Sequence, residues 1–194
     1  MTDGKVLVMR TCDASMKSHG GFVWPKSGPV ECPDWIANEK CGNGLHGLLW
    51  GSGDASLMDW SESSNWIVVE VEQSDIVDLG GKVKFPRGVV VYCGTRKEAA
   101  DLICKHCPAG TKVTLGTATA GDMGTATAGD MGTATAGYMG TATAGDMGTI
   151  LIRHVDGVKW KTFVGVVGED GIKPNIPYKV VSGKLSETQK GEAE

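Results

Sequence analysis

Residues 116–149 read GTATAGDM GTATAGDM GTATAGYM GTATAGDM GT, and this stretch decides the fold. Four units of eight residues follow one another from Gly116, and they differ only at Tyr138, which replaces an aspartate. A strict short period is typical of proteins that stack one structural unit on the next. The sequence therefore predicts a short β-solenoid, a rod of stacked strands, over residues 111–152.

Each repeat divides into a strand and a bend. Thr-Ala-Thr-Ala has the period of two that places β-branched residues on one face of a strand. Gly-Asp-Met-Gly supplies the bend, because Gly and Asp tolerate positive φ. The alternative is a disordered linker, but flexible linkers are typically rich in Gly and Ser. Alanine suits a narrow interior, so we expect the threonines outside and these alanines inside: Ala118, Ala126, Ala134 and Ala142.

The repeat allows two windings. Eight residues could form one complete small coil, or half of a flattened coil of sixteen residues. We favour the half-coil, because a strand of four residues and a bend of four leave little room to close a circle. This winding places Asp122 over Tyr138 on one edge and Asp130 over Asp146 on the opposite edge. The two residues of each pair belong to neighbouring strands, which lie about 4.8 Å apart.

The N-terminal region indicates an α+β domain. Strand patterns lie at residues 5–10, 22–24, 66–71, 82–85 and 89–93, and the continuous apolar run of the last predicts a strand buried on both faces. Thr95 with Glu98 three residues later forms a capping box, which predicts a helix over residues 96–104. The glycine-rich segment 41–54 indicates a tight, irregular loop.

Four parts follow in order along the chain. They are an α+β head (1–110), the solenoid (111–152), a β cap (153–185) and a disordered polar tail (186–194), so the protein is expected to be mainly β. The cap is expected because an open coil end exposes unpaired backbone groups.

Composition excludes some function classes. The net charge is −4 and Lys and Arg form no basic run, which argues against direct nucleic-acid binding. No apolar run reaches about 18 residues, so the sequence predicts no membrane-spanning helix. The N-terminus lacks a signal-peptide pattern, so we expect a cytoplasmic protein whose six cysteines are reduced.

The segment CGNGLHGLLWGSGD over residues 41–54 concentrates groups that could carry chemistry. Cys41 and His46 could form a nucleophilic pair, in which the imidazole activates the thiol. Alternatively, the glycines shape a loop in which His46 bonds a backbone carbonyl. Both interpretations remain open from the sequence.

Metal and cofactor sites are weakly indicated. Cys104 and Cys107 form a single CxxC, and zinc would need two further ligands such as His106 with Cys93 or Cys41. The repeat aspartates could bind calcium, but calcium-binding repeats carry more acidic oxygen per turn. We therefore expect no metal and no cofactor.

Several segments resemble known families. The strings CGNGLHG (41–47), WIVVEV (66–71), KVKFPRGVVVYCG (82–94) and VGEDGIKPNIPY (167–178), with the octapeptide repeats, resemble a group of uncharacterised bacterial and phage proteins. This resemblance implies a phage or mobile-element origin and no established activity. The head also resembles the ADP-ribosyltransferase-like fold, although Tyr is absent from the expected place. That resemblance implies Arg10, His46 and Glu70 as catalytic candidates.

Three functions follow from these observations. The leading hypothesis is a phage-encoded, non-catalytic protein that binds or inhibits a host protein, with a homodimer as a further possibility because short solenoids can abut. The second is the transferase enzyme. The third is ice binding, because Thr-x-Thr places hydroxyls about 7 Å apart along a strand and about 4.8 Å apart across strands. The expected binding residues are Thr117, Thr119, Thr125, Thr127, Asp122, Asp130, Tyr138 and Asp146.

Overall fold

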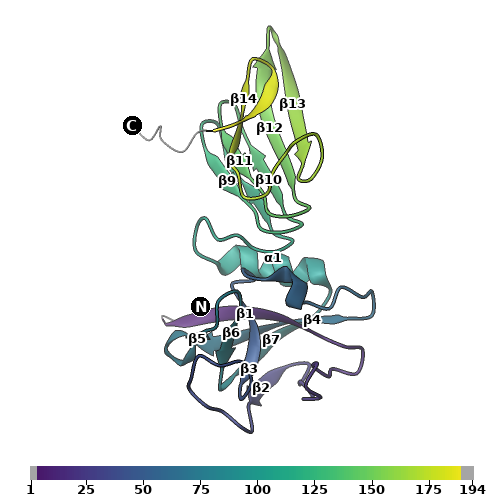
Figure 1. The fold of residues 1–194 in the computed structure, drawn as a ribbon, viewed down its shortest axis with the longest axis vertical. Helices are drawn as coiled ribbons and strands as arrows, with labels where there is room; N and C mark the ends of the chain where they lie inside the picture. The colour runs from purple at the N-terminus through teal and green to yellow at the C-terminus, as the bar shows by residue number, and fades with distance from the viewer. Residues whose placement is uncertain (1–3, 189–194) are drawn as a thin grey trace. The chain divides into compact units, whose positions relative to one another are not determined.

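The structure is a computed structural model that describes residues 4–188 of the chain. It divides into two compact units, Met1–Pro108 and Ala109–Glu194, and each is considered by itself (Figure 1). The first unit is a sheet with one covering helix. The second consists of two smaller sheets.

The first unit is built on a seven-stranded antiparallel sheet. Its strand order is β2-β7-β4-β1-β3-β6-β5. Long hydrophobic strands in the middle supply most of the pairing, with β1 antiparallel to β4 over eight residue pairs. The strands are β1 (Lys5–Cys12), β2 (Gly28–Glu31), β3 (Leu45–Leu49), β4 (Asn65–Glu72), β5 (Val77–Asp78), β6 (Val83–Phe85) and β7 (Arg87–Gly94).

Helix α1 (Arg96–His106) packs on β1, β4 and β7 through a short apolar stripe (Figure 1). Its N-terminus follows the predicted capping box with one change. The Thr95 hydroxyl accepts from the Glu98 N–H and donates to the Glu98 carboxylate, while the Thr95 N–H donates to the Tyr92 hydroxyl. Ala99, Ala100 and Ile103 are the buried residues of the helix. Two 3-10 turns, η1 (Ala55–Leu57) and η2 (Gln73–Asp75), complete the unit.

The hydrophobic core of the first unit includes alternate residues of β1. Val6 and Val8 pack there with Ile67, Phe85 and Trp24, the last of which comes from the segment between β1 and β2. Since side chains alternate along a strand, Arg10 is on the same side as Val6 and Val8. The charged Arg10 side chain therefore lies on the face of the sheet that carries these two core valines, beneath the segments that cover it.

Two details of the head differ from the sequence predictions. Within β7, Val90 is buried but Val89 and Val91 are exposed, so the strand is not buried on both faces. A register shift between β4 and β7 occurs at this point, and β7 lies next to the edge strand β2. Residues 22–24 form no strand and contribute only an isolated bridge from Val23 to Lys17.

Strand β3 lies inside the segment that the glycines indicated as irregular. Gly47 is in its centre, where an added Cβ would lie 2.5 Å from Val8 Cγ1 and 2.7 Å from the Met9 carbonyl oxygen. Glycine is therefore required for β3 to approach β1, and it does not break the strand here. Glycine-rich composition misled the prediction because a close-packed strand and a loop can share it.

The second unit alternates successive repeats between two four-stranded sheets, β13-β12-β10-β8 and β15-β14-β11-β9. Parallel partners are sixteen residues apart, with Thr133 opposite Thr117 and Thr141 opposite Thr125. This register confirms the interval of the half-coil winding. The strands are β8 (Thr117–Thr119), β9 (Thr125–Thr127), β10 (Thr133–Ala136), β11 (Thr141–Thr143), β12 (Thr149–Asp156), β13 (Lys159–Val166), β14 (Tyr178–Val181) and β15 (Lys184–Glu187).

Alanines form the core between these two sheets, as predicted. Ala126, Ala134 and Ala142 are buried, and Ala118 in the first coil is half-buried. The second alanine of each repeat joins them, because Ala128, Ala136 and Ala144 are also buried. Ile150 and Ile152 of β12 continue the same core where the repeats end.

The bends correct one prediction. In each repeat the positive φ belongs to methionine, from 52° at Met131 to 57° at Met123, and not to Gly or Asp. The glycine after the methionine is needed for space, because a Cβ on Gly132 would lie 2.7 Å from the Gly116 carbonyl oxygen of the preceding coil. The close approach of repeats sixteen residues apart thus explains that glycine better than backbone freedom does.

Antiparallel hairpins end both small sheets. β13 folds back on β12, and β15 pairs with β14, which itself pairs with β11. Ser186 and Glu187, which the sequence assigned to the tail, belong to β15 because they continue its ladder with β14. Residues 189–194 of the predicted tail lie outside the described residues.

Candidate functional site

One sheet of the second unit carries a regular surface of threonines. Alternation along each strand directs the alanines inward, so the threonines of β8, β10 and β12 project outward. All of them are exposed or half-buried. We call this surface the threonine face, and it consists of Thr117, Thr119, Thr133, Thr135 and Thr149.

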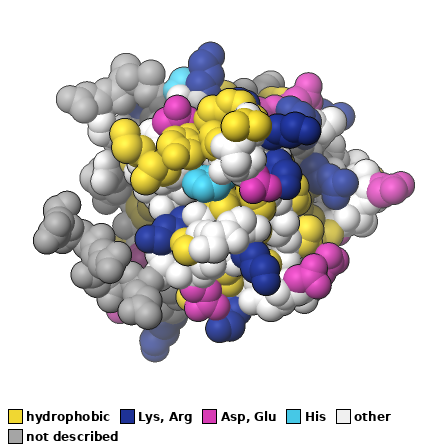
Figure 2. All heavy atoms as spheres, turned by 90° about the horizontal axis from the view of Figure 1, so that it is seen from above, with side chains coloured by type: hydrophobic (Ala, Val, Ile, Leu, Met, Phe, Trp, Pro, Cys, Tyr) yellow, Lys and Arg dark blue, Asp and Glu magenta, His cyan; other side chains and the backbone are white. Residues whose placement is uncertain are grey.

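Apolar residues extend the threonine face toward the β12–β13 hairpin. Val166 lies opposite Thr149 and Val164 lies opposite Leu151, so these side chains share the outward side. Val164 is 58% exposed and Val166 is 36% exposed. Figure 2 views the second unit from the hairpin side and shows hydrophobic side chains gathered there beside lysines and arginines.

The outward side of the other small sheet is different. Thr143 is only 7% exposed, although it occupies the same repeat position as the half-buried Thr135. Strand β14 places Tyr178 inward opposite Ala142, so the next residue, Lys179, is on the outward side. The two threonine-bearing sheets are therefore not equivalent. β14, beside β11, carries the outward Lys179, whereas on β12 the outward residue after Thr149 is Leu151 and the charged Arg153 comes only at the next outward position.

Two of the repeat aspartates join repeats that are sixteen residues apart. Asp122 Oδ1 accepts a hydrogen bond of 2.9 Å from the Tyr138 N–H, and Asp130 Oδ1 accepts one of 3.0 Å from the Asp146 N–H. These pairs are the ones that the half-coil winding predicts. The aspartates thus use one carboxylate oxygen within the fold.

Tyr138 has an aromatic environment that explains its departure from the repeat. Its ring stacks on His154 at 5.2 Å and meets Trp160 edge-on at 5.8 Å. Both partners come from the β12–β13 hairpin, which occupies the place of a further coil. Tyrosine therefore packs against the hairpin where an aspartate would meet another repeat.

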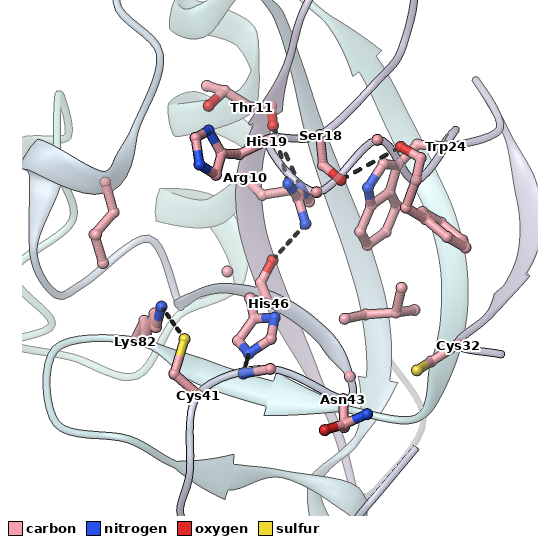
Figure 3. A pocket seen from close by; sticks show the side chains of 18 of the residues that line it. Arg10, Thr11, Ser18, His19, Trp24, Cys32, Cys41, Asn43, His46 and Lys82 are labelled. Atoms are coloured by element: carbon pink, nitrogen blue, oxygen red, sulfur yellow. Dashed lines mark hydrogen bonds between the residues drawn. The ribbon is translucent and has the colours of Figure 1, made fainter. Parts of the chain in front are cut away.

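The first unit contains a cavity of about 810 Å³ (Figure 3). Its lining combines cationic and thiol groups with an apolar side. The charged or reactive members that matter most are Arg10, Cys41, His46 and Lys82. The cavity therefore brings together Arg10, Cys41 and His46, which the sequence indicated, with Lys82, which it did not.

His46 is held as a neutral imidazole. Its Nε2 accepts a hydrogen bond of 3.4 Å from the Gly42 N–H of the loop. Burial, followed by the charges of Lys82 and Arg10, lowers the pKa of His46 to about 4. A backbone hydrogen bond with Gly44 acts in the opposite sense and raises the pKa of His46, as expected of a ring that donates to a carbonyl.

Cys41 is paired with a lysine and not with His46. Lys82 Nζ donates to Cys41 Sγ over 3.1 Å. This hydrogen bond and the lysine charge lower the pKa of the exposed Cys41 thiol, against a smaller opposing effect of burial. Among the described residues, no hydrogen bond joins Cys41 to His46. The activated pair that the sequence suggested is therefore not assembled in this geometry.

Lys84 holds the loop that carries Cys41. It is fully buried, and its Nζ donates to Asn38 Oδ1 and the Lys40 carbonyl oxygen, each at 2.8 Å. A lysine in an alternating strand pattern normally indicates the solvent side, so the sequence carried no signal of this role. Lys84 positions the loop from below and adds positive charge near His46.

The three residues implied by the transferase resemblance do not meet. The Arg10 guanidinium donates to the His46 carbonyl oxygen over 3.0 Å, so these two are adjacent. Glu70 instead forms a salt bridge of 2.7 Å with Lys5 and lines a different pocket with Arg87. Glu70 is therefore not placed beside Arg10 and His46, and the catalytic roles of these three residues stay a prediction. Asp54 is also occupied elsewhere, because it caps η1 by accepting from Ser56.

The cysteines and acidic groups show no metal centre in the described part of the chain. No cluster of three or more His, Cys, Asp and Glu side chains occurs among residues 4–188. All six cysteines are free of disulfides. No helix in this range is long and apolar enough to cross a membrane.

Comparison with protein families identifies the first unit. Residues 6–103 match the model of a family described as a domain of unknown function, DUF7666. The matched range contains the strings CGNGLHG, WIVVEV and KVKFPRGVVVYCG on which the resemblance rested. The head therefore matches a family without an assigned function, as that resemblance implied, while the repeats and residues 167–178 lie outside the matched range and a phage origin stays a prediction.

The N-terminal half of the chain is similar to the N-terminal region of ice nucleation proteins. The ice nucleation protein InaU of Pantoea ananas is 40% identical over 108 residues, which is 55% of this chain and 10% of the relative. An ice nucleation protein of Pseudomonas syringae is 45% identical over 105 residues, which is 53% of this chain and 9% of the relative. An ice nucleation protein of Xanthomonas campestris pv. translucens is 40% identical over 106 residues, which is 54% of this chain and 7% of the relative. The matches thus span a tenth or less of the relatives' length. No solved structure matches this chain.

Proposed function

We propose that this chain, which belongs to the DUF7666 family, binds the surface of ice crystals through the threonine face. The observation that carries the proposal is the regular array of outward threonines on β8, β10 and β12. The names of the relatives add support, because the proteins that match the N-terminal half of this chain are called ice nucleation proteins.

Threonine is suited to this role for a physical reason. Its hydroxyl can hydrogen-bond to a water molecule while its methyl group limits the water's other orientations. Thr117 and Thr119 are two positions apart on one strand, about 7 Å, and Thr133 is one strand away, about 4.8 Å. A rigid array with these two spacings can hold several waters in order at once. No charged side chain interrupts the five threonines to bind water in a competing arrangement.

The rigidity comes from the winding that we propose for the repeats, a β-solenoid with sixteen residues per coil. Parallel pairing at intervals of sixteen residues, the alanine core and the aspartate hydrogen bonds all support it. In such a coil the threonine positions are fixed by the backbone of the sheet. Little side-chain freedom would then be lost when the face meets ice, because threonine is stiff at χ1.

The size of the face favours binding over nucleation. Five threonines on three strands cover a small area, whereas a template for freezing must order a cluster of water large enough to grow. We therefore expect this chain to adsorb to existing crystals and to slow their growth. The similarity to the relatives lies in the N-terminal half, so the activity of those much longer proteins is not assumed for this chain.

The proposal is tested by the incorporation of protein into slowly growing ice. Thr135→Lys places a charge in the middle strand of the threonine face, and Thr127→Lys places the same charge at the matching repeat position of the other sheet. Both threonines are half-buried, so the substitutions are comparable. We expect the unmodified chain and Thr127→Lys to enter the ice fraction and Thr135→Lys to remain in the liquid.

Thermal melting of each variant checks that the second unit remains folded. Exclusion of the unmodified chain from ice would refute the proposal. Equal incorporation of the two folded lysine variants would show that the threonine face is not the binding surface. Binding of a host protein stays a prediction, and no observation on the structure or the relatives favours it over ice.

A further inference from the structure

The cavity of the first unit has features of a ligand site that the threonine face does not use. Its volume of about 810 Å³ lies within the range of small-molecule sites. Its lining includes the apolar or aromatic side chains of Phe22, Trp24, Leu45 and Met58 as well as the cationic groups. Such sites usually combine a hydrophobic lining with a few polar groups that fix the orientation of the ligand.

Arg10 is a half-buried cation that lacks an acidic partner among the described residues. A guanidinium has five N–H donors. Nε and Nη2 each donate to the Thr11 carbonyl oxygen at 3.3 Å, and Nη1 donates to the His46 carbonyl oxygen at 3.0 Å. One N–H on Nη1 and one on Nη2 take part in none of these bonds, and the Cys12 side chain, which also hydrogen-bonds to the guanidinium, can engage one of them. Carboxylate and phosphate groups are the partners that match a pair of guanidinium donors.

Trp24 provides a second, independent donor at the same place. Its side chain is 2% exposed, and its Nε1–H is buried without a hydrogen-bond partner. The Arg10 Cζ lies 4.3 Å from the centre of the indole ring. In Figure 3 the indole nitrogen is on the edge of the ring that faces Ser18 and Arg10. A buried donor without an acceptor is costly, and a bound oxygen atom would relieve that cost.

The surrounding charges favour an anion. Lys82 lies at the cavity and donates to Cys41 Sγ, and Lys84 is buried beneath the loop. The acidic residue of the lining, Asp34, already accepts from Cys32 Sγ at 2.9 Å and Asn43 Nδ2 at 2.8 Å. The lowered pKa of His46, caused by burial and then by Lys82 and Arg10, agrees with a positive potential in the cavity.

We propose that this cavity binds a small molecule with an aromatic or aliphatic body and one carboxylate or phosphate group. The anionic oxygens accept from an Arg10 N–H outside these bonds and from the Trp24 indole N–H. The body of the ligand packs against apolar lining residues such as Phe22 and Met58. This site is independent of the threonine face, so either proposal can fail without the other.

The test follows the Trp24 indole N–H by NMR in the full-length chain. The chain has six tryptophans, and the signal that disappears in Trp24→Phe identifies the one concerned. The probes are benzoate and phenyl phosphate, with benzyl alcohol as the neutral probe of similar size. We expect a saturable downfield shift of this signal with at least one anion and no saturable shift with benzyl alcohol.

Two variants test the roles of the donors by calorimetry with the anion that binds. Arg10→Met should weaken binding about tenfold or more, because a hydrogen bond to a charged group is removed. Trp24→Phe should weaken it several-fold while keeping the ring. Arg96→Met, at the exposed start of α1, removes a charge of the same kind outside the cavity and should leave affinity unchanged.

Each outcome decides the proposal. Binding of benzoate alone identifies a carboxylate ligand, binding of phenyl phosphate alone identifies a phosphate ligand, and binding of both supports the shared chemistry. Absence of a saturable shift with both anions overturns the proposal, as does equal binding of benzyl alcohol. If Arg10→Met does not fold, the probe series and Trp24→Phe still provide the decision.

Discussion

Alanine at the inward positions determines how closely the two small sheets can approach. Ala134 and Ala142 are fully buried, and their side chains end at a methyl group. Larger residues join this core outside the repeats, among them Ile150 and Ile152 of β12 and Tyr178 of β14. The repeat composition therefore sets a narrow core, and this much followed from the alternation of Thr and Ala alone.

Enlarging one of these alanines should destabilise the second unit. Ala134→Leu forces a branched side chain into space sized for a methyl, which typically costs about 1–3 kcal/mol. Thr127→Val changes only an outward hydroxyl, and we expect an effect within about 0.5 kcal/mol. Chemical denaturation of both variants measures the difference. Equal, negligible effects would contradict an alanine core.

A pH effect is expected from His46. Its pKa is about 4 in the folded chain, below the ordinary value of 6.5, mainly because of burial and then Lys82 and Arg10. The unfolded chain therefore binds more protons between these values, so stability is complete above pH 6.5 and falls as the pH drops toward 4. His46 is only half-buried, so the slope should be well below about 1.4 kcal/mol per pH unit.

His46→Gln is the matched variant, because it keeps an acceptor for the Gly42 N–H without a titrating ring. The free energy of unfolding, measured from pH 4 to pH 7, should fall less steeply in this variant. Carboxylates with lowered pKa values, such as Asp54, titrate in both proteins and cancel in the comparison. Identical slopes would mean that the imidazole is not held neutral by its surroundings.

At the scale of elements, the aspartates join strands that are sixteen residues apart. Asp130→Ala removes the acceptor of the Asp146 N–H and should cost about 0.5–1.5 kcal/mol. Asp130→Asn keeps the Oδ1 acceptor and should cost less. Asp146→Ala is the control at the same repeat position, because only its backbone N–H takes part in the bond. Thermal melting ranks the stabilities of the three variants. A loss of stability in Asp146→Ala as large as in Asp130→Ala would argue against a stabilising hydrogen bond from the Asp146 N–H to the Asp130 carboxylate.

Elements with strong local patterns were predictable, and those defined by packing were not. The β-branched run of β4 and the Thr95 capping box of α1 were identified from the sequence because their causes are local. Strand β3 was missed because Gly47 is set by the distance to β1, which no local pattern reveals. The positive φ of Met123 was assigned to Gly and Asp for the same reason, since neighbouring coils decide the shape of the bend.

The candidate site in the head was only half predictable. Cys41 and His46 lie close in the sequence and drew attention as a possible pair. Their actual partners, Lys82 and the Gly42 N–H, depend on how β6 lies beside β3. Trp24 carried no signal at all, because its unpaired indole N–H is a property of the folded cavity.

At the scale of the whole molecule, the interval of sixteen residues governs how the face can grow. Duplicating residues 124–139 adds one coil and leaves β12 in the sheet of β8 and β10. Duplicating only 124–131 adds the same kind of repeat but moves β12 and its two isoleucines to the other sheet. The longer insertion should therefore fold and extend the threonine face by two threonines, while the shorter should disturb the hairpins that end both sheets.

Thermal hysteresis, the gap between the melting and growth temperatures of an ice crystal, tests the central claim most directly. It should be measured at equal molar concentration for the unmodified chain, the sixteen-residue insertion and Thr135→Lys. Because the face gains one strand of threonines in the insertion and gains a charge in Thr135→Lys, we predict that hysteresis rises in the first and falls in the second. A value equal to that of buffer for the unmodified chain and for the folded longer chain would contradict ice binding.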